Sequence, residues 1–195
     1  MNNNDQLHPL DKIEKLNDED VIKTMFIEHR HILSILDELD AIANQISDEN
    51  KDIDMNIKIK ASSLVEKIIS AEAHHAREEN ALFPAIESKG VLGPPHHMRE
   101  EHDIIREMKY DLKRKLNNMD LKSEIQKNEI CMKILDLCNT LRAHIRKENT
   151  ILYPLALEII DSSEWKEIKL RCDEIGYCSF ETSCRDNNQE YEKSK

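Results

Sequence analysis

The chain has 195 residues, enough for one domain with a substantial core, and a formal net charge of −11. This acidic balance excludes non-specific nucleic-acid binding, which needs clustered lysines and arginines, so we expect no nucleic-acid partner. With aromatic residues at 4% and only 3 glycines and 5 prolines, the composition favours long helices and excludes a β-sandwich or barrel.

The first segment, residues 1–17, is polar and aperiodic, and we expect it to form a flexible N-terminal arm. It lacks the basic region followed by an apolar region that marks a secretory signal. No window of roughly 18 apolar residues occurs in the chain, so we expect no membrane-spanning segment. The five cysteines do not resemble the framework of a secreted disulfide-rich protein. These features predict a cytoplasmic location.

Four long helices are predicted within residues 18–162. The first covers residues 18–47, where apolar residues recur at helical spacing. The second covers residues 54–88 and ends at a lysine–glycine stop signal. The third begins with a glycine and two prolines and covers residues 93–117, and the fourth starts at a capping box and covers residues 123–160. Short connections make consecutive helices antiparallel, so we predict an all-α, up-down-up-down antiparallel four-helix bundle.

A short helix from Glu164 to Ile175 is predicted after the bundle, and it opens a third segment, residues 163–195. Three cysteines, spaced six residues apart, lie in this segment. Structural zinc sites and iron–sulfur clusters use closer cysteine pairs, so we interpret these three as free thiols in a mobile tail. A redox or metal-binding role is the alternative interpretation. The three residues are Cys172, Cys178 and Cys184.

The second and fourth predicted helices carry the same motif. The sequence HHAREENALFP at residues 74–84 matches HIRKENTILYP at residues 144–154. In both, a histidine is followed by a glutamate four residues later and by a proline ten residues later. Residues four apart share one face of a helix, so each pair offers a nitrogen and a carboxylate to one site. The pairs are His74 with Glu78 and His144 with Glu148.

Apolar neighbours predict that these side chains, and one histidine on each of the other two helices, face the core. His144 and Glu148 share an apolar stripe that includes Ile151. A glutamate that faces a core is costly unless it is paired or bound to a metal. The predicted metal ligands are His29, His74, Glu78, His102, His144 and Glu148.

Four imidazoles and two carboxylates are too many for one tetrahedral zinc ion, and they suit two ions that share the carboxylates. Mixed nitrogen and oxygen ligands favour iron or manganese over a metal bound by thiolates. His75 and Glu79 form a second pair at the same spacing on the second helix. The repeat on the fourth helix favours His74 and Glu78, and replacement by His75 and Glu79 stays open as an alternative.

Each motif ends in a proline, Pro84 or Pro154, which has no N–H to donate. We predict a kink in each helix just beyond the ligands, with a simple bend of the helix end as the alternative. Tyr153 precedes the second proline. We interpret it as a core residue that could also donate a hydrogen bond to a bound ligand.

These motifs together resemble the hemerythrin-like (HHE cation-binding) domain over roughly residues 20–160. The matching pieces lie at residues 28–30, 74–84, 100–103 and 144–154. The resemblance implies a di-iron centre, with an oxygen bridge between two iron ions, and small-ligand chemistry with dioxygen or nitric oxide. His-x-x-x-Glu on both the second and fourth helices is most similar to bacterial proteins that repair damaged iron–sulfur clusters.

The chain also departs from the patterns of this family. Oxygen-carrying hemerythrins have a histidine where Met98 precedes His102 by four residues, and an aspartate at a five-residue step where Glu148 follows His144 by four. The repair proteins usually carry an N-terminal cysteine-containing domain, which is not among these residues.

Three functional interpretations follow. The first is a non-haem di-iron protein of the nitric oxide or oxidative stress response, or of iron–sulfur cluster repair, with iron–sulfur proteins as partners. The second is a dioxygen-binding storage, carrier or sensor protein. The third is a metal-free structural bundle that binds other proteins. No positioned nucleophile is evident, so whether the chain is an enzyme is left open.

Overall fold

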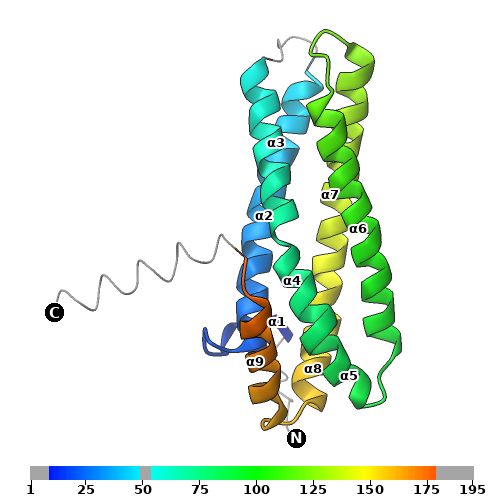
Figure 1. Ribbon diagram of the computed structural model, residues 1–195. Helices are drawn as coiled ribbons and strands as arrows, with labels where there is room; N and C mark the ends of the chain where they lie inside the picture. The colour runs from blue at the N-terminus through cyan, green and yellow to red at the C-terminus, as the bar shows by residue number, and fades with distance from the viewer. Residues whose placement is uncertain (1–8, 49–53, 179–195) are drawn as a thin grey trace, which may run out of the picture.

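A computed structural model of the chain describes residues 9–48 and 54–178 (Figure 1). The described residues form α-helices, two π-helical turns (η1 and η2) and short connections. In chain order these elements are α1 (Pro9–Glu14), α2 (Val21–Ile46), α3 (Met55–Ser70), α4 (Glu72–Arg77), η1 (Glu78–Leu82), α5 (Phe83–Ser88), α6 (Gly93–Asn117), α7 (Glu124–Lys147), η2 (Glu148–Leu152), α8 (Tyr153–Ile159) and α9 (Glu164–Ile175).

Four helical rods stand side by side, with α3, α4, η1 and α5 joined in the second rod and α7, η2 and α8 in the fourth (Figure 1). Helix α2 packs against α3 and α7, and α6 packs against the same two helices on the other side. Each rod therefore touches two neighbours around a shared interior. The predicted all-α helical bundle is confirmed.

Two apolar clusters fill the bundle. One contains Leu36, Leu64 and Ile134, and the other contains Met25 and Phe83. On α2, α6 and the fourth rod, His29, His102 and Glu148 respectively come between residues of one cluster and residues of the other. The interior therefore has a polar belt with apolar packing on both sides.

Each His-x-x-x-Glu motif ends in a π-helical turn. In η1 the N–H of Phe83 donates to the carbonyl of Glu78, and in η2 the N–H of Tyr153 donates to the carbonyl of Glu148. The next residue is proline in both rods, and proline has no N–H for the carbonyl four residues before it. The wider turn accommodates the missing donor and adds one residue to the helical register. A π turn that begins at the motif glutamate thus precedes each proline, and the kink expected there stays a prediction.

The extra residue rotates the end of the fourth rod. The helical period predicts Ile151 on the inward stripe of His144, but its side chain is 58% exposed. Leu152 and Tyr153 face inward instead, with exposed fractions of 1% and 0%. The prediction for Ile151 is wrong because it assumes an unbroken period of about 3.6 residues per turn.

Both ends of the described chain pack on the bundle more closely than the sequence suggests. The predicted flexible arm contains α1, whose Ile13 is fully buried in the second apolar cluster. Helix α9 spans the predicted residues, but Cys172 and Cys178 are each only 1% exposed. The prediction of a mobile tail is therefore wrong for these two cysteines, and Cys184 lies outside the described residues.

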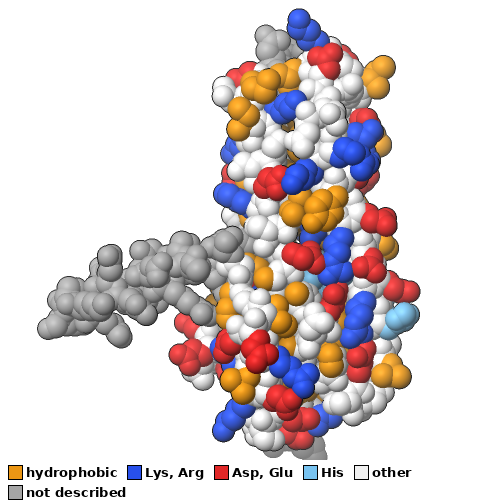
Figure 2. Space-filling model, viewed as in Figure 1, with side chains coloured by type: hydrophobic (Ala, Val, Ile, Leu, Met, Phe, Trp, Pro, Cys, Tyr) orange, Lys and Arg blue, Asp and Glu red, His pale blue; other side chains and the backbone are white. Residues whose placement is uncertain are grey.

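The outer surface of the bundle is highly charged. Figure 2 shows lysine and arginine side chains interspersed with aspartate and glutamate over the visible face. Among the described helices, none combines the length and the apolar character needed to cross a membrane.

Candidate metal centre

The polar belt contains all six predicted ligands. They come from every rod of the bundle, and none has an exposed fraction above 2%. Their positions are His29 on α2, His74 on α4, Glu78 at the start of η1, His102 on α6, His144 on α7 and Glu148 at the start of η2.

The ligand atoms fall into two adjacent groups. Within each group, one ligand atom per residue lies within 4.8 Å of every other. One group contains two imidazoles and two carboxylates, and the other contains three imidazoles. The groups are His29, His74, Glu78 and Glu148, and then His75, His102 and His144.

His75 therefore lies in the second group, while His74 lies in the first. It comes from the same helix as His74, and its ring stacks on that of His102 at a centroid distance of 3.9 Å. Glu79, the other member of the alternative pair, instead accepts a hydrogen bond at 2.7 Å from Nδ1 of His102. The belt thus offers five imidazoles, one more than the sequence predicts.

Glu148 links the two groups. Its Oε2 lies 3.1 Å from Nε2 of His29, and its Oε1 lies 3.0 Å from Nε2 of His144. Glu78 spans them through one oxygen, because its Oε2 lies 3.6 Å from Nε2 of His74 and 3.4 Å from Nε2 of His102. Both carboxylates are therefore placed to be shared by two cations.

Many of these buried atoms lack a hydrogen-bond partner among the described residues. Leaving a buried polar atom without a partner costs free energy, and native proteins rarely do so. Cations bound by these atoms would remove that cost, and the nitrogen and oxygen donors suit iron or manganese. The residues therefore fit a pair of metal ions. The unpaired atoms are Nδ1 of His75, Oε2 of Glu78, Nε2 of His102, Nε2 of His144, and both Oε1 and Oε2 of Glu148.

Outer partners orient four of the histidines. Each accepts a hydrogen bond from Nδ1, which leaves Nε2 of the same ring to face the site. The four contacts are Glu28 Oε2 to His74 at 2.7 Å, Glu101 Oε2 to His144 at 2.8 Å, Asn149 Oδ1 to His29 at 2.8 Å and Glu79 Oε1 to His102 at 2.7 Å.

Sequence reasoning missed these four partners, although their positions are regular. Glu28 and Glu101 each precede the single inward histidine of α2 and α6. Glu79 and Asn149 each follow a motif glutamate. The recurrence of a Glu-His pair on the first and third helices was the available signal, but only the packing shows which ring each side chain reaches.

The two shared carboxyl groups differ in their electrostatics. Burial and the nearby charge of Glu148 raise the pKa of Glu78 well above its ordinary value. Burial acts in the same direction on Glu148, but the imidazoles of His144, His102 and His29 outweigh it and hold that pKa well below its ordinary value. Opposite shifts are expected when two carboxyl groups share one buried space.

The imidazole of His74, which is hydrogen-bonded to Glu28, is kept neutral. Burial is the main cause, and with the neighbouring His29 it lowers the pKa of His74 to about 4. A neutral imidazole keeps a lone pair for a metal ion at neutral pH. Burial works against the charge of Glu28, but its hydrogen bond with His74 and the charge of Arg77 lower the Glu28 pKa to about 2.

Tyr153 borders the site. Its ring stacks on that of His29, with centroids 5.5 Å apart, and its hydroxyl donates to Oε1 of Glu78 at 2.8 Å. The first motif has Phe83 at the equivalent position, so only one motif supplies a hydroxyl. The sequence places Tyr153 near a bound ligand, and the structure shows that its hydroxyl is directed at a carboxylate.

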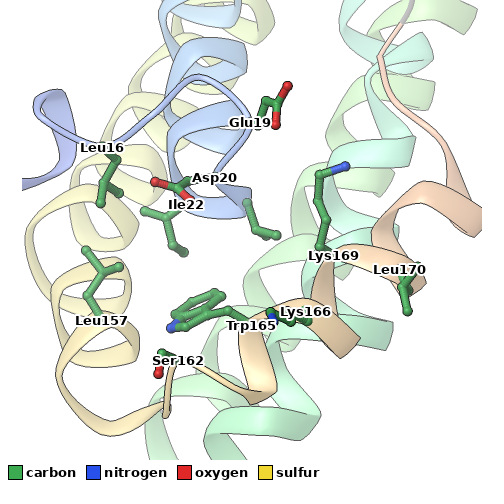
Figure 3. A pocket seen from close by; sticks show the side chains of 11 residues that line it. Leu16, Glu19, Asp20, Ile22, Leu157, Ser162, Trp165, Lys166, Lys169 and Leu170 are labelled. Carbon is green, nitrogen blue, oxygen red and sulfur yellow. The ribbon is translucent and has the colours of Figure 1, made fainter.

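A separate hollow of about 670 Å³ lies between the α1–α2 connection, α8 and α9 (Figure 3). Trp165 forms part of its apolar wall, and charged side chains of both signs meet at its rim: Glu19, Asp20, Lys166 and Lys169. None of the predicted ligands lines it. The candidate metal centre is therefore distinct from this hollow.

Comparison with known proteins identifies one family. The model of the hemerythrin HHE cation-binding domain matches residues 20–156. The matched span contains both motifs, all predicted ligands and His75, and it ends before α9. No curated protein matches the chain.

Proposed function

The chain belongs to the hemerythrin HHE cation-binding family, and from this we propose that it is a non-haem di-iron protein that acts in nitric oxide or oxidative stress, or in iron–sulfur cluster repair. The observation that carries the proposal is the set of buried nitrogen and oxygen atoms without a hydrogen-bond partner. These atoms belong to two adjacent groups of candidate ligands, and the two carboxylates lie near both groups. In a metal-free scaffold these buried atoms would have mainly one another as neighbours, with the Glu148 oxygens 3.1 Å from Nε2 of His29 and 3.0 Å from Nε2 of His144, and bound cations would satisfy them more completely.

Two ions, not one, are supported by the ligand count. The pair His29 and His74 faces one side of Glu148, and the three imidazoles of the other group face its opposite oxygen. Seven ligand side chains exceed the needs of a single ion and suit two ions with bridging carboxylates. Bound iron ions would supply reversible redox chemistry and positions for a diatomic ligand such as nitric oxide or dioxygen.

The protein's own residues orient the ligands and shield them from water. Met25 and Phe83, both fully buried, cover the belt on one side, and Leu36 and Ile105 cover it on the other. This apolar packing excludes water and strengthens the electrostatic interactions inside the site. The hydroxyl oxygen of Tyr153 lies 2.8 Å from Oε1 of Glu78 and donates its proton to it, which adds a polar group beside the group of ligands that has two imidazoles.

One feature of the ligand set supports the repair or nitric oxide interpretation over that of a reversible oxygen carrier. Met98, where oxygen carriers have a histidine, is only 5% exposed and belongs to the apolar cluster, while His75 supplies an imidazole from a different helix. The ligands therefore come from the helices in a different distribution from that in the carriers. This difference favours nitric oxide or repair chemistry, and dioxygen binding is the second candidate because of the apolar walls.

The decisive first measurement is metal content and the visible spectrum of protein purified without air, recorded before and after oxidation. We expect about two irons per chain, as the ligand count requires, and an oxo-bridge band on oxidation. Protein that contains no iron and takes none up on reconstitution would refute the di-iron centre.

A second assay separates the candidate functions. Iron-loaded protein is incubated with an enzyme whose iron–sulfur cluster has been damaged by nitric oxide, and recovery of activity is measured. Recovery above that produced by the same amount of free ferrous iron supports repair. A reversible oxygen band of the di-ferrous protein, without any recovery, supports dioxygen binding instead.

A further inference from the structure

The segment that follows the family match lies against the metal centre. Helix α9 packs on α2, α4 and η1, the elements that carry His29, His74 and Glu78 (Figure 1). Its last residue is Ile175, and Gly176 follows with a φ of 94°, a conformation that favours glycine. We call α9 together with residues 176–178 the C-terminal clasp.

The clasp reaches the outer partner of His74. The backbone N–H of Cys178 donates to Oε1 of Glu28 at 3.3 Å, and its thiol lies 3.6 Å from the carbonyl of Ala71. Tyr177 lies beside it, with its ring 4.6 Å from the guanidinium carbon of Arg77. All three contacts are made by residues beyond the matched span.

Glu28 and Arg77 form a buried ion pair. Their exposed fractions are 0% and 1%, and the guanidinium donates to both carboxylate oxygens of Glu28. Arg77 also donates through Nε to the carbonyl of Ala73 at 3.2 Å. Glu28 therefore receives donors from Arg77, from the clasp and from Nδ1 of His74. An ion pair without water depends strongly on its geometry, because its desolvation must be repaid by well-placed partners.

Within residues 9–48 and 54–178, no segment covers the second motif in a comparable way. Lys147 occupies the position of Arg77 and contacts Glu101, the outer partner of His144. The side chains of Lys147 and Glu101 are 34% and 18% exposed. Water can therefore solvate this pair, whereas the pair beside His74 relies on protein atoms.

We propose that Tyr177 and the backbone of Cys178 are positioning residues for the metal centre: they fix Arg77 and Glu28, which hold the ring of His74 toward the ion on the His29 side. This inference rests on the proposed di-iron function. It makes retention of one ion of the pair dependent on a segment outside the family domain.

The test compares Tyr177→Ala, Tyr177→Phe and the matched control Tyr110→Ala in the full chain. Tyr110 is 54% exposed on α6, so its loss removes a tyrosine without touching the clasp. Each protein is loaded with ferrous iron without air. The release of iron to a chelator and the Mössbauer spectrum of the two iron sites are measured, together with the unfolding free energy of the metal-free protein.

We expect Tyr177→Ala to release one of the two irons about tenfold faster, the lower end of the effect of losing an outer partner. One Mössbauer component should change and the other should not. Tyr177→Phe keeps the ring over Arg77 and should restore the wild-type rate, and Tyr110→Ala should match wild type.

Three results would overturn the inference. Wild-type protein that binds no iron removes the proposed function as well. If Tyr177→Ala releases both irons at the wild-type rate, the role of the clasp is refuted and the proposed di-iron function stands. A lower unfolding free energy with unchanged iron release and spectrum would show that the clasp only stabilises the fold.

Discussion

The two halves of the bundle, residues 20–88 and 93–160, contribute the same kinds of residues to the candidate metal centre. Each supplies a Glu-His pair from one helix, a His-x-x-x-Glu motif from the next and a π turn before a proline. Their equivalent positions are Glu28 and Glu101, His29 and His102, His74 and His144, Arg77 and Lys147, and Glu78 and Glu148.

The surroundings of the halves differ. The outer ion pair of the first half is fully buried under the C-terminal clasp, and that of the second half meets solvent. The first motif adds His75 where the second has Ile145, and the second adds Tyr153 where the first has Phe83. A repeated local motif therefore sets the ligand framework, while the packing around each copy sets its charge and hydration.

Removal of the shared carboxylates should have the largest effect on metal binding in both halves. We expect Glu148→Ala and Glu78→Ala each to abolish binding of the metal pair, because each carboxylate lies near imidazoles of both groups. Iron per chain after reconstitution measures the effect. Ile151→Ala, on the same π turn but 58% exposed, is the control. Full iron content in Glu78→Ala would show that Glu148 alone joins the ions.

Loss of the charged side chain of Arg77 in the first half should lower the unfolding free energy more than loss of that of Lys147 in the second half. Arg77→Met leaves Glu28 buried without its cation and should cost about 3–5 kcal/mol of unfolding free energy in the metal-free protein. Lys147→Met leaves a partly solvated Glu101 and should cost about 0–1 kcal/mol. Urea unfolding of both variants tests the difference. Similar costs would contradict the contrast between a buried and a solvated pair.

Replacement of His75, which has no histidine counterpart in the second motif, should weaken the binding of one iron. His75→Ile gives the first motif the residue of the second and removes one imidazole of the three-histidine group. We expect one iron to bind more weakly by more than the roughly 10–100-fold that loss of an outer partner costs. Competition with a chelator measures this, with His96→Ala as a control because the His96 side chain is 75% exposed. Wild-type affinity would assign His75 to packing against His102.

The smallest effect is expected from Tyr153→Phe, which makes the two motifs alike at this position. The change removes the hydroxyl that donates to Glu78 but keeps the ring against His29. Loss of one buried hydrogen bond should lower the unfolding free energy of the metal-free protein by about 1 kcal/mol. Thermal or urea unfolding checks this, and an unchanged stability would mean that Glu78 finds another donor.

The sequence alone determined the helices and the ligand candidates. Apolar periodicity predicted the helical spans, and α6 and α9 begin and end as predicted. The recurrence of His-x-x-x-Glu predicted which side chains face inward, because residues four apart share a helix face. Both inferences succeed because they depend on local geometry within a single helix.

The tertiary structure decided what one helix cannot specify. Which ring Glu28 or Asn149 reaches, and whether His75 faces the site, depends on the relative depth and rotation of neighbouring helices. The outward turn of Ile151 depends on an added residue in a π turn, which periodicity does not register. Cys178 is buried only because a distant segment folds back onto α2 and α4. These contacts join residues far apart in the chain, so their physical cause is packing between elements.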